Sequence, residues 1–384
     1  MGKTSIEWTD MTWNCVRGCT RVSEGCRFCY AERQAARFAG HDLIEIEANS
    51  EINRGGHGPF AGFAKMTAAG PRWTGRVELI PHMLALPLQW KRPRRIFVNS
   101  MSDLFHEALP FEQIAAVFGV MATCPQHIFQ VLTKRPERAR EFIESVSRVA
   151  RAPMSNGREV TVILGRADEF LPDDLSDKLW TRAWSNAKDA WPLPNVWLGT
   201  SCENQETADR RIPELLRTPA AIRFVSCEPM LAHVDFTAYL GRRNRPVDRL
   251  NDSLGENLAP HLDQVIVGGE SGPHARPFDL AWPRSVIGQC KAAKVACFIK
   301  QLGAQPIDGY LTACEVVEGE RGIQRPTDQP LTEEVAAAIL RDHHLVDIPA
   351  GGFPRRLALK DRKGGDMSEW PEYLRVREFP EAPR

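Results

Sequence analysis

The stretch Asn195-Val196-Trp197-Leu198-Gly199-Thr200-Ser201-Cys202-Glu203 is a short apolar run that ends in polar side chains. A run this short, and this rich in β-branched or aromatic residues, is typical of a strand buried on both faces. Similar runs recur along the chain, the last of them weaker than the others: Arg95–Asp103, His127–Lys134, Ile222–Pro229, Gln264–Ser271 and Ala296–Gln301. The sequence therefore predicts about six parallel strands.

Segments with helical periodicity separate these runs, at residues 111–123, 136–149, 205–217 and 280–293. The alternation favours either a parallel βα barrel or an open doubly wound sheet. Barrel strands converge with their carboxyl ends on one mouth, whereas a doubly wound sheet gathers its functional residues at a switch point. Five of the strands end in polar residues, namely Ser100 and Asp103, Thr133 and Lys134, Ser201 and Glu203, Ser226 and Glu228, and Glu270 and Ser271. We therefore expect an α/β fold, a partial (β/α) barrel of about six parallel strands.

The expected barrel covers residues 1–303. Residues 155–194 are rich in acidic side chains and too long for an ordinary βα loop, so we expect an insertion near residues 150–194. The strand pattern is lost from residue 304 onward. Residues 304–384 are therefore expected to form a C-terminal appendage that covers the barrel mouth.

The composition limits the classes of function. The chain has 384 residues, with 49 basic and 49 acidic side chains, so no global field attracts nucleic acid or anionic lipid. The N-terminus lacks the apolar core of a signal peptide, and no apolar run approaches the length of a membrane span. We expect a cytoplasmic protein without a membrane partner. In a reducing compartment, clustered cysteines favour metal binding over disulfides.

Four of the ten cysteines lie close together near the N-terminus: Cys15, Cys19, Cys26 and Cys29. The last three have the spacing C-x6-C-x2-C, and glycines at positions 18 and 25 let the intervening loop turn sharply. Such a group of thiolates holds a zinc ion or an iron–sulfur cluster. A structural zinc site would use all four thiols, whereas a reactive cluster would use three and keep one position open. The spacing alone leaves both alternatives open.

The cysteine loop, followed by βα units with polar strand ends, resembles the radical S-adenosylmethionine superfamily, whose partial barrel holds a 4Fe-4S cluster on three cysteines. Further stretches are similar to a narrower family of phage-associated and bacterial proteins, largely uncharacterised and related in pattern to spore photoproduct lyase. These stretches are Ile6-Glu7-Trp8-Thr9-Asp10, Val196–Ser201, Cys227-Glu228-Pro229, Lys363-Gly364-Gly365-Asp366 and Glu369-Trp370-Pro371. The resemblance covers nearly the whole chain.

The spacing of the thiols departs from the commonest superfamily pattern, C-x3-C-x2-C, because six residues separate Cys19 from Cys26. The narrower family uses this longer loop. The resemblance therefore implies that Cys19, Cys26 and Cys29 are the cluster ligands, that Cys15 is not one, and that the metal centre is iron–sulfur rather than zinc.

The resemblance also implies S-adenosylmethionine as a cofactor, cleaved by an electron to give a 5′-deoxyadenosyl radical, with a donor such as flavodoxin or ferredoxin. By strand order, Ser100 and Ser102 are expected at the methionine amino group and Lys134 at its carboxylate. The remaining cofactor-binding candidates are Ser201 and Glu203 near the ribose and Glu228 at the same mouth.

Cys202 and Cys227 follow strands at the expected mouth, where a thiol can donate a hydrogen atom to a substrate radical; the simpler alternative is that both are small buried packing residues. The other distant thiols include no C-x2-C pair, so a second cluster is not expected; they are Cys124, Cys290, Cys297 and Cys314.

The sequence leaves the substrate open, with a nucleic-acid base as one candidate. The alternative function is a non-catalytic binding protein whose N-terminus is stabilised by zinc or an inert cluster.

Overall fold

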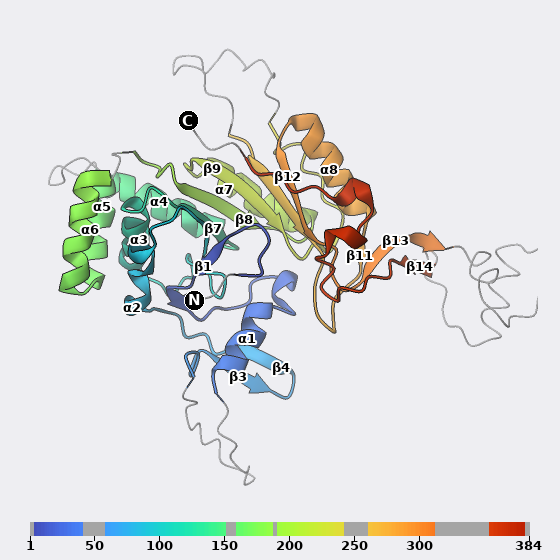
Figure 1. The fold of residues 1–384 in the computed structure, drawn as a ribbon, viewed down its shortest axis with the longest axis horizontal. Helices are drawn as coiled ribbons and strands as arrows, with labels where there is room; N and C mark the ends of the chain where they lie inside the picture. Colours follow the sequence, from blue (N-terminus) through green and yellow to red (C-terminus); the bar gives the residue numbers. More distant parts are fainter. Residues whose placement is uncertain are drawn as a thin grey trace, which may run out of the picture.

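The fold is a curled, wholly parallel seven-stranded sheet flanked by helices, in a computed structural model that describes residues 4–40, 58–150, 159–186, 190–241, 260–311 and 353–380 (Figure 1). Neighbours in the sheet follow chain order, as in a barrel. The strands are β1 (Met11–Trp13), β6 (Arg95–Val98), β7 (Ile128–Thr133), β8 (Val196–Ser201), β9 (Ile222–Cys227), β10 (Gln264–Gly268) and β12 (Ala296–Gln301). The predicted partial (β/α) barrel is confirmed. The strand beyond the six expected is β1, which is only three residues long.

Helices in the crossovers cover the outer face of the sheet (Figure 1). They are α3 (Phe111–Ala122), α4 (Pro136–Ala150), α7 (Gln205–Arg217) and α8 (Ala281–Ala293). Local sequence explains where two of them begin. Pro136 opens α4, where a missing N–H costs nothing, and Asn204 caps α7 by accepting a hydrogen bond from the Thr207 N–H at 3.0 Å.

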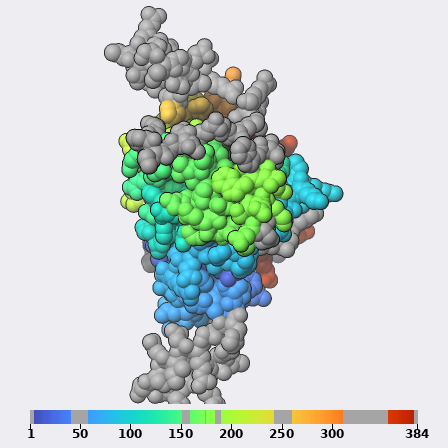
Figure 2. All heavy atoms as spheres, turned by 90° about the vertical axis from the view of Figure 1, so that its left-hand side faces the viewer, coloured from blue at the N-terminus to red at the C-terminus, as the bar shows by residue number. Residues whose placement is uncertain are grey.

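Two further helices, α5 (Glu159–Phe170) and α6 (Asp173–Asn186), lie in the expected insertion between β7 and β8. Helix α5 packs closely on α3, because Gly119 has no side chain and a Cβ there would lie 2.7 Å from the Cβ of Ala167. Figure 2 shows α5 and α6, in green, on one face of the molecule, above the blue N-terminal part.

The concave face of the sheet is filled by a cluster of large apolar side chains: Trp8, Phe97, Trp197, Ile222, Phe224, Ile266 and Phe298. Trp8 precedes β1 and inserts among the strands, with its ring 4.6 Å from that of Phe97. Gly199 makes room for this cluster, since a Cβ there would lie 2.5 Å from the Phe224 ring. The barrel is therefore a packed core below its carboxyl end, and a cavity lies at the strand ends.

An N-terminal layer lies across the carboxyl ends of the strands (Figure 1). It consists of the cysteine loop with its 3₁₀ turn η1 (Glu24–Cys26), helix α1 (Tyr30–Phe38) and the hairpin of β3 (Ala64–Thr67) and β4 (Gly70–Trp73). Alanines on one face of α1 pack against Phe60, Phe63 and Ala64. A short pair, β2 (Val16–Arg17) with β5 (Glu78–Leu79), joins this layer to the barrel, and α2 (Pro81–Leu84) and the 3₁₀ turn η2 (Leu86–Gln89) follow it.

The C-terminal part forms a small sheet of β11 (Phe278–Asp279), β13 (Pro306–Leu311) and β14 (Phe353–Arg356), followed by the 3₁₀ turns η4 (Met367–Glu369) and η5 (Glu372–Leu374). The chain then runs back along the outer edge of β12. The Ile299 N–H donates to the Val376 carbonyl at 2.8 Å, and the Glu378 N–H donates to the Cys297 carbonyl at 2.8 Å. The expected division at residue 304 stays a prediction.

Cys314 lies outside the described residues. In the part of the chain that the structure describes, no helix is long and apolar enough to cross a membrane.

Candidate active site

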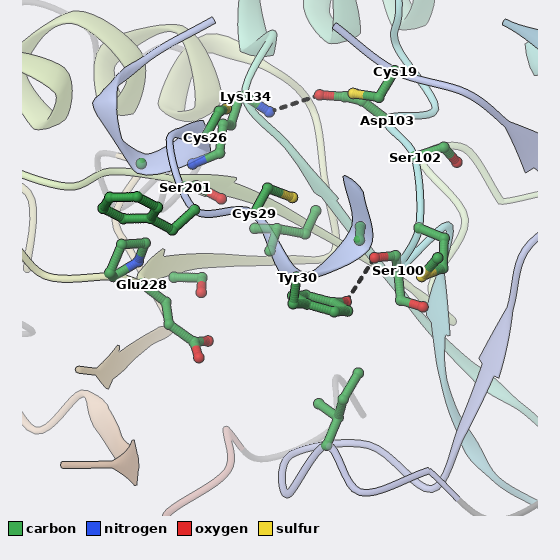
Figure 3. Close-up of a pocket in the computed structure, with 18 of the residues that line it drawn as sticks. Cys19, Cys26, Cys29, Tyr30, Ser100, Ser102, Asp103, Lys134, Ser201 and Glu228 are labelled. Carbon is green, nitrogen blue, oxygen red and sulfur yellow. Dashed lines mark hydrogen bonds between the residues drawn. The ribbon is translucent and has the colours of Figure 1, made fainter. Parts of the chain in front are cut away.

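A cavity of about 380 Å³ lies at the carboxyl ends of the barrel strands, beneath the cysteine loop and α1 (Figure 3). Its size suits a small organic ligand or cofactor. Trp8, Phe97 and Leu132 form an apolar part of its wall. Polar side chains from successive strand ends form the rest, as expected for a barrel mouth.

Three of the four N-terminal cysteines line this cavity: Cys19, Cys26 and Cys29. Figure 3 shows them on the loop and at the start of α1, with Cys29 near the middle of the view. Cys15 does not line it. Its side chain is fully buried, and its thiol donates to the side-chain oxygen of Asn99 across 3.7 Å. The structure thus places the three predicted ligands on the wall of one cavity and the fourth thiol away from it.

The surroundings of Cys19 and Cys29 do not favour the thiolate form. Burial raises the pKa of Cys19 to about 12; the negative charge of Asp103 adds to this effect and Arg135 opposes it. Burial also raises the pKa of Cys29. A positive centre would therefore have to drive deprotonation of these sulfurs.

No three His, Cys, Asp or Glu side chains among the described residues are gathered as ligands of one metal ion. Three sulfurs around one zinc ion would lie roughly 4 Å apart, given Zn–S bonds of about 2.3 Å.

Protein contacts hold the cysteine loop at three points. The guanidinium of Arg135 donates to the Thr20 hydroxyl at 2.8 Å, and the Ser23 hydroxyl donates to Glu203 at 2.7 Å. Arg276 donates to the Glu24 carbonyl at 3.1 Å from the far side of the mouth. The loop is therefore positioned by the barrel strand ends.

Asp103 and Arg135 form a buried ion pair beside Cys19, with 3.1 Å between Arg135 Nη1 and Asp103 Oδ2. Asp103 also accepts hydrogen bonds from the Thr133 hydroxyl at 2.7 Å and from the Lys134 N–H at 3.0 Å (Figure 3). The pair thus fixes the ends of β6 and β7 relative to each other and, through Arg135, to the cysteine loop.

Glu203 is almost completely buried and accepts from three side chains. Lys134 donates to its Oε1, and Arg211 lies 3.0 Å from its Oε2; the Ser23 contact completes the set. Burial opposes ionisation of this carboxyl, but the charges of Lys134 and Arg211 outweigh it and lower the pKa of Glu203 to about 2. Glu203 does not line the cavity but lies behind Lys134, which does.

The predicted serines line the cavity and also fasten the chain after β6. Asn99 adopts a left-handed conformation (φ 58°), and the Ser100 hydroxyl donates to Asn14 at 3.2 Å. The Ser102 hydroxyl donates to the Val16 carbonyl at 3.0 Å. Tyr30 closes this side, donating to the Ser100 carbonyl at 2.6 Å (Figure 3).

The opposite wall carries Ser201 and Glu228, as predicted, together with Lys300, which pairs with Glu228. Along β8 and β9, alternate residues face the cavity side. Ser201 and Ser226 face it, whereas Cys202 and Cys227 belong to the core between the sheet and the helices. Both thiols are fully buried there. Their surroundings match the simpler alternative, small packing residues, and the hydrogen-donor role stays a prediction.

Sequence reasoning missed five cations that line the cavity: Arg21, Arg33, Arg135, Lys300 and Lys363. Lys300 occupies an inward position of β12. A lysine within an otherwise apolar strand could have been recognised in the sequence as a candidate site residue. Arg33 lies one helical turn after Cys29. Lys363 comes from the C-terminal part and pairs with Glu7 at 2.7 Å, a contact that links opposite ends of the chain.

The chain belongs to a protein family, because residues 3–338 match the family described as "Protein of unknown function (DUF5131)". No curated protein matches the chain. No solved structure matches it either.

Proposed function

We propose that this chain is a radical S-adenosylmethionine enzyme whose 4Fe-4S cluster is held by Cys19, Cys26 and Cys29. One observation carries the proposal: these three thiols line a single cavity at the carboxyl ends of a parallel barrel, while Cys15 is turned away from it. Three cysteines leave a cluster one iron without a protein ligand, which is the position that S-adenosylmethionine needs.

The cavity also offers groups for the cofactor. Ser100, Ser102 and Ser201 present hydroxyls on two sides, and Lys134 and Glu228 present charges. The bound cluster and cofactor would supply reductive cleavage of the sulfonium to give a 5′-deoxyadenosyl radical. Glu203 is a positioning residue in this proposal, since it holds the Lys134 ammonium and the Ser23 hydroxyl in place from behind the wall.

The chain's own contribution is orientation and exclusion of water. The cysteine loop is covered on its outer side by a contact between Phe28 and His274, whose rings lie 5.8 Å apart. Arg276 reaches across the same gap to the Glu24 carbonyl and is itself held by Glu270 at 2.7 Å. These contacts close the outer side of the mouth over the thiols.

The alternative, a binding protein folded by a structural metal, is weaker on two grounds. A four-thiol zinc site would need Cys15, which is buried elsewhere. In addition, Arg135, Glu203 and Arg276 also hold the loop through hydrogen bonds.

Anaerobic reconstitution with iron and sulfide tests the proposal. The full chain, reduced with dithionite in the presence of S-adenosylmethionine, should form 5′-deoxyadenosine and methionine even without its substrate. Cys26→Ala should form neither, and Cys15→Ala serves as the matched control that keeps the activity. Reconstituted wild-type protein that takes up iron but leaves S-adenosylmethionine intact would exclude the proposed reaction.

A further inference from the structure

We propose that Arg33 binds the phosphate of a nucleotide substrate in this cavity, so that the substrate class is a nucleoside phosphate, free or within a single strand. The inference names the substrate of the site proposed above and in that respect rests on that proposal. The observations that carry it are the pairing of the cavity's cations, the placement of Arg33 and the aromatic side chains beside it.

Six lysines and arginines line the cavity, and five of them already have an acidic partner. The pairs are Arg21 with Glu32, Lys134 with Glu203, Arg135 with Asp103, Lys300 with Glu228 and Lys363 with Glu7. Among the described residues, Arg33 alone of the six has no acidic partner and no side-chain hydrogen bond. Its planar fork of donors is therefore available for an anion, and phosphate is the group that this geometry matches best.

The Arg33 guanidinium lies close to the backbone of the opposite wall. Gly272, in the loop after β10, has φ +106°, and a Cβ there would lie 2.8 Å from Arg33 Nη1. The glycine thus lets the backbone of one wall approach the guanidinium of the other. Arg33 lies one helical turn after Cys29, and its N–H donates to the Cys29 carbonyl at 3.3 Å. A phosphate bound to Arg33 would therefore lie near the third cysteine.

Aromatic surface suited to a nucleobase lies in the same wall. Tyr30 lines the cavity with about 40% of its surface exposed, although its hydroxyl is bonded to Ser100. Trp73, from β4, lines the cavity beside α1 and is only partly buried. Aromatic rings stack on any nucleobase, whatever the sequence. A phosphate contact is likewise independent of sequence, so the two contacts together would bind nucleotides without selecting a base.

The outward face of α1 extends this wall beyond the cavity. Tyr30, Arg33 and Gln34 line the cavity, and Arg37 follows on the same helical face. Arg37 is exposed and has no ion pair with another described residue. A nucleotide within a strand would therefore place a second phosphate near Arg37, whereas a free mononucleotide would not reach it.

Binding measurements on the full chain as purified, before reconstitution, keep this test separate from the radical chemistry. The probes are 5′-nucleoside monophosphates by calorimetry and a fluorescein-labelled twelve-nucleotide single strand by anisotropy. Arg33→Gln should weaken both roughly tenfold or more, since a charge-assisted hydrogen bond contributes about 1.5–3 kcal/mol. Arg33→Lys should recover part of the loss. Lys291→Gln, an exposed cation on α8, should change neither.

The two sources of phosphate are distinguished by Arg37→Gln. If the substrate is a strand, this variant should bind the oligonucleotide more weakly, with the slope of log K against log salt reduced by about 0.7, yet bind mononucleotides normally. If the substrate is a free nucleotide, only the mononucleotides should bind tightly in wild type, and Arg37→Gln should have no effect.

Three results would overturn the inference. Wild-type protein could fail to bind any of the probes, or Arg33→Gln could bind them as wild type does. Alternatively, calorimetry on reconstituted protein could show that Arg33→Gln loses S-adenosylmethionine and keeps nucleotides, which would assign the guanidinium to the cofactor carboxylate. Failure of the proposed enzyme function would instead appear as absence of iron or of 5′-deoxyadenosine.

Discussion

Replacing Glu203 by glutamine removes one negative charge from a buried site that holds two cations. Lys134 and Arg211, whose side chains are 19% and 1% exposed, then lose the carboxylate that neutralises them. The pKa of Glu203 falls from 4.5 to about 2 in the folded chain. At about 1.4 kcal/mol per pKa unit, the stabilisation of the charged form is about 3 kcal/mol. Breaking a buried ion pair costs about 3–5 kcal/mol in general, so the two estimates agree.

Urea unfolding of the cluster-free chain, followed by tryptophan fluorescence, measures this loss. Glu214→Gln is the matched control, because Glu214 also pairs with two cations, Arg140 at 2.8 Å and Arg217, but lies near the surface. We expect Glu203→Gln to lower the free energy of unfolding by about 3 kcal/mol, and Glu214→Gln to lower it by less than about 1 kcal/mol. Equal, small effects of the two substitutions would refute the reasoning.

The same comparison has a defined pH dependence. Since the pKa of Glu203 in the folded chain lies below the ordinary value of 4.5 for a glutamate carboxyl, its contribution is fully present above pH 4.5 and is lost as the pH falls toward about 2. The difference in unfolding free energy between wild type and Glu203→Gln should therefore be constant near neutral pH and shrink in acid. A difference that grows on acidification would contradict the proposed charge pairing.

Three further predictions concern the site and the core. Alanine at Cys19, Cys26 or Cys29 should abolish the visible sulfur-to-iron absorption of reconstituted protein, while alanine at Cys15 should keep it; colour retained in Cys26→Ala would overturn the ligand assignment. Gly199→Ala should destabilise the fold by about 1–3 kcal/mol in urea, because the new methyl group meets the Phe224 ring, whereas Gly288→Ala, with open space around it, should not. Cys202→Ala and Cys227→Ala should leave unchanged both 5′-deoxyadenosine formation and the products formed from the substrate; variants that still form 5′-deoxyadenosine but give altered or fewer substrate products would return these thiols to the reaction.

The sequence predicted the barrel because six of its strands are apolar runs and five of these runs end in polar residues. It missed β1 because Met11–Trp13 is too short to show a pattern. The sequence also did not predict that the segment near Val376 pairs with β12. This segment has no strand periodicity, so its pairing depends on the folded sheet beside it.

At the site, spacing and resemblance predicted three thiols at one cavity, but not the direction of the neighbouring side chains. Ser201 and Cys202 are adjacent in sequence, yet the pleat of β8 points one toward the cavity and the other into the core. Glu203 was expected at the cavity surface and lies behind it, because Arg211 from α7 holds its second oxygen. Ion pairing of this kind depends on distances between elements, which the sequence does not contain.

Mössbauer spectroscopy of protein reconstituted with isotopically enriched iron tests the central claim most directly. If three cysteines hold the proposed cluster, one of about four iron atoms per chain is left without a protein ligand, and adding S-adenosylmethionine should change the spectrum of that iron site and leave the others as they were. A spectrum that does not respond to the cofactor, or a chain that retains zinc in place of iron, would contradict it.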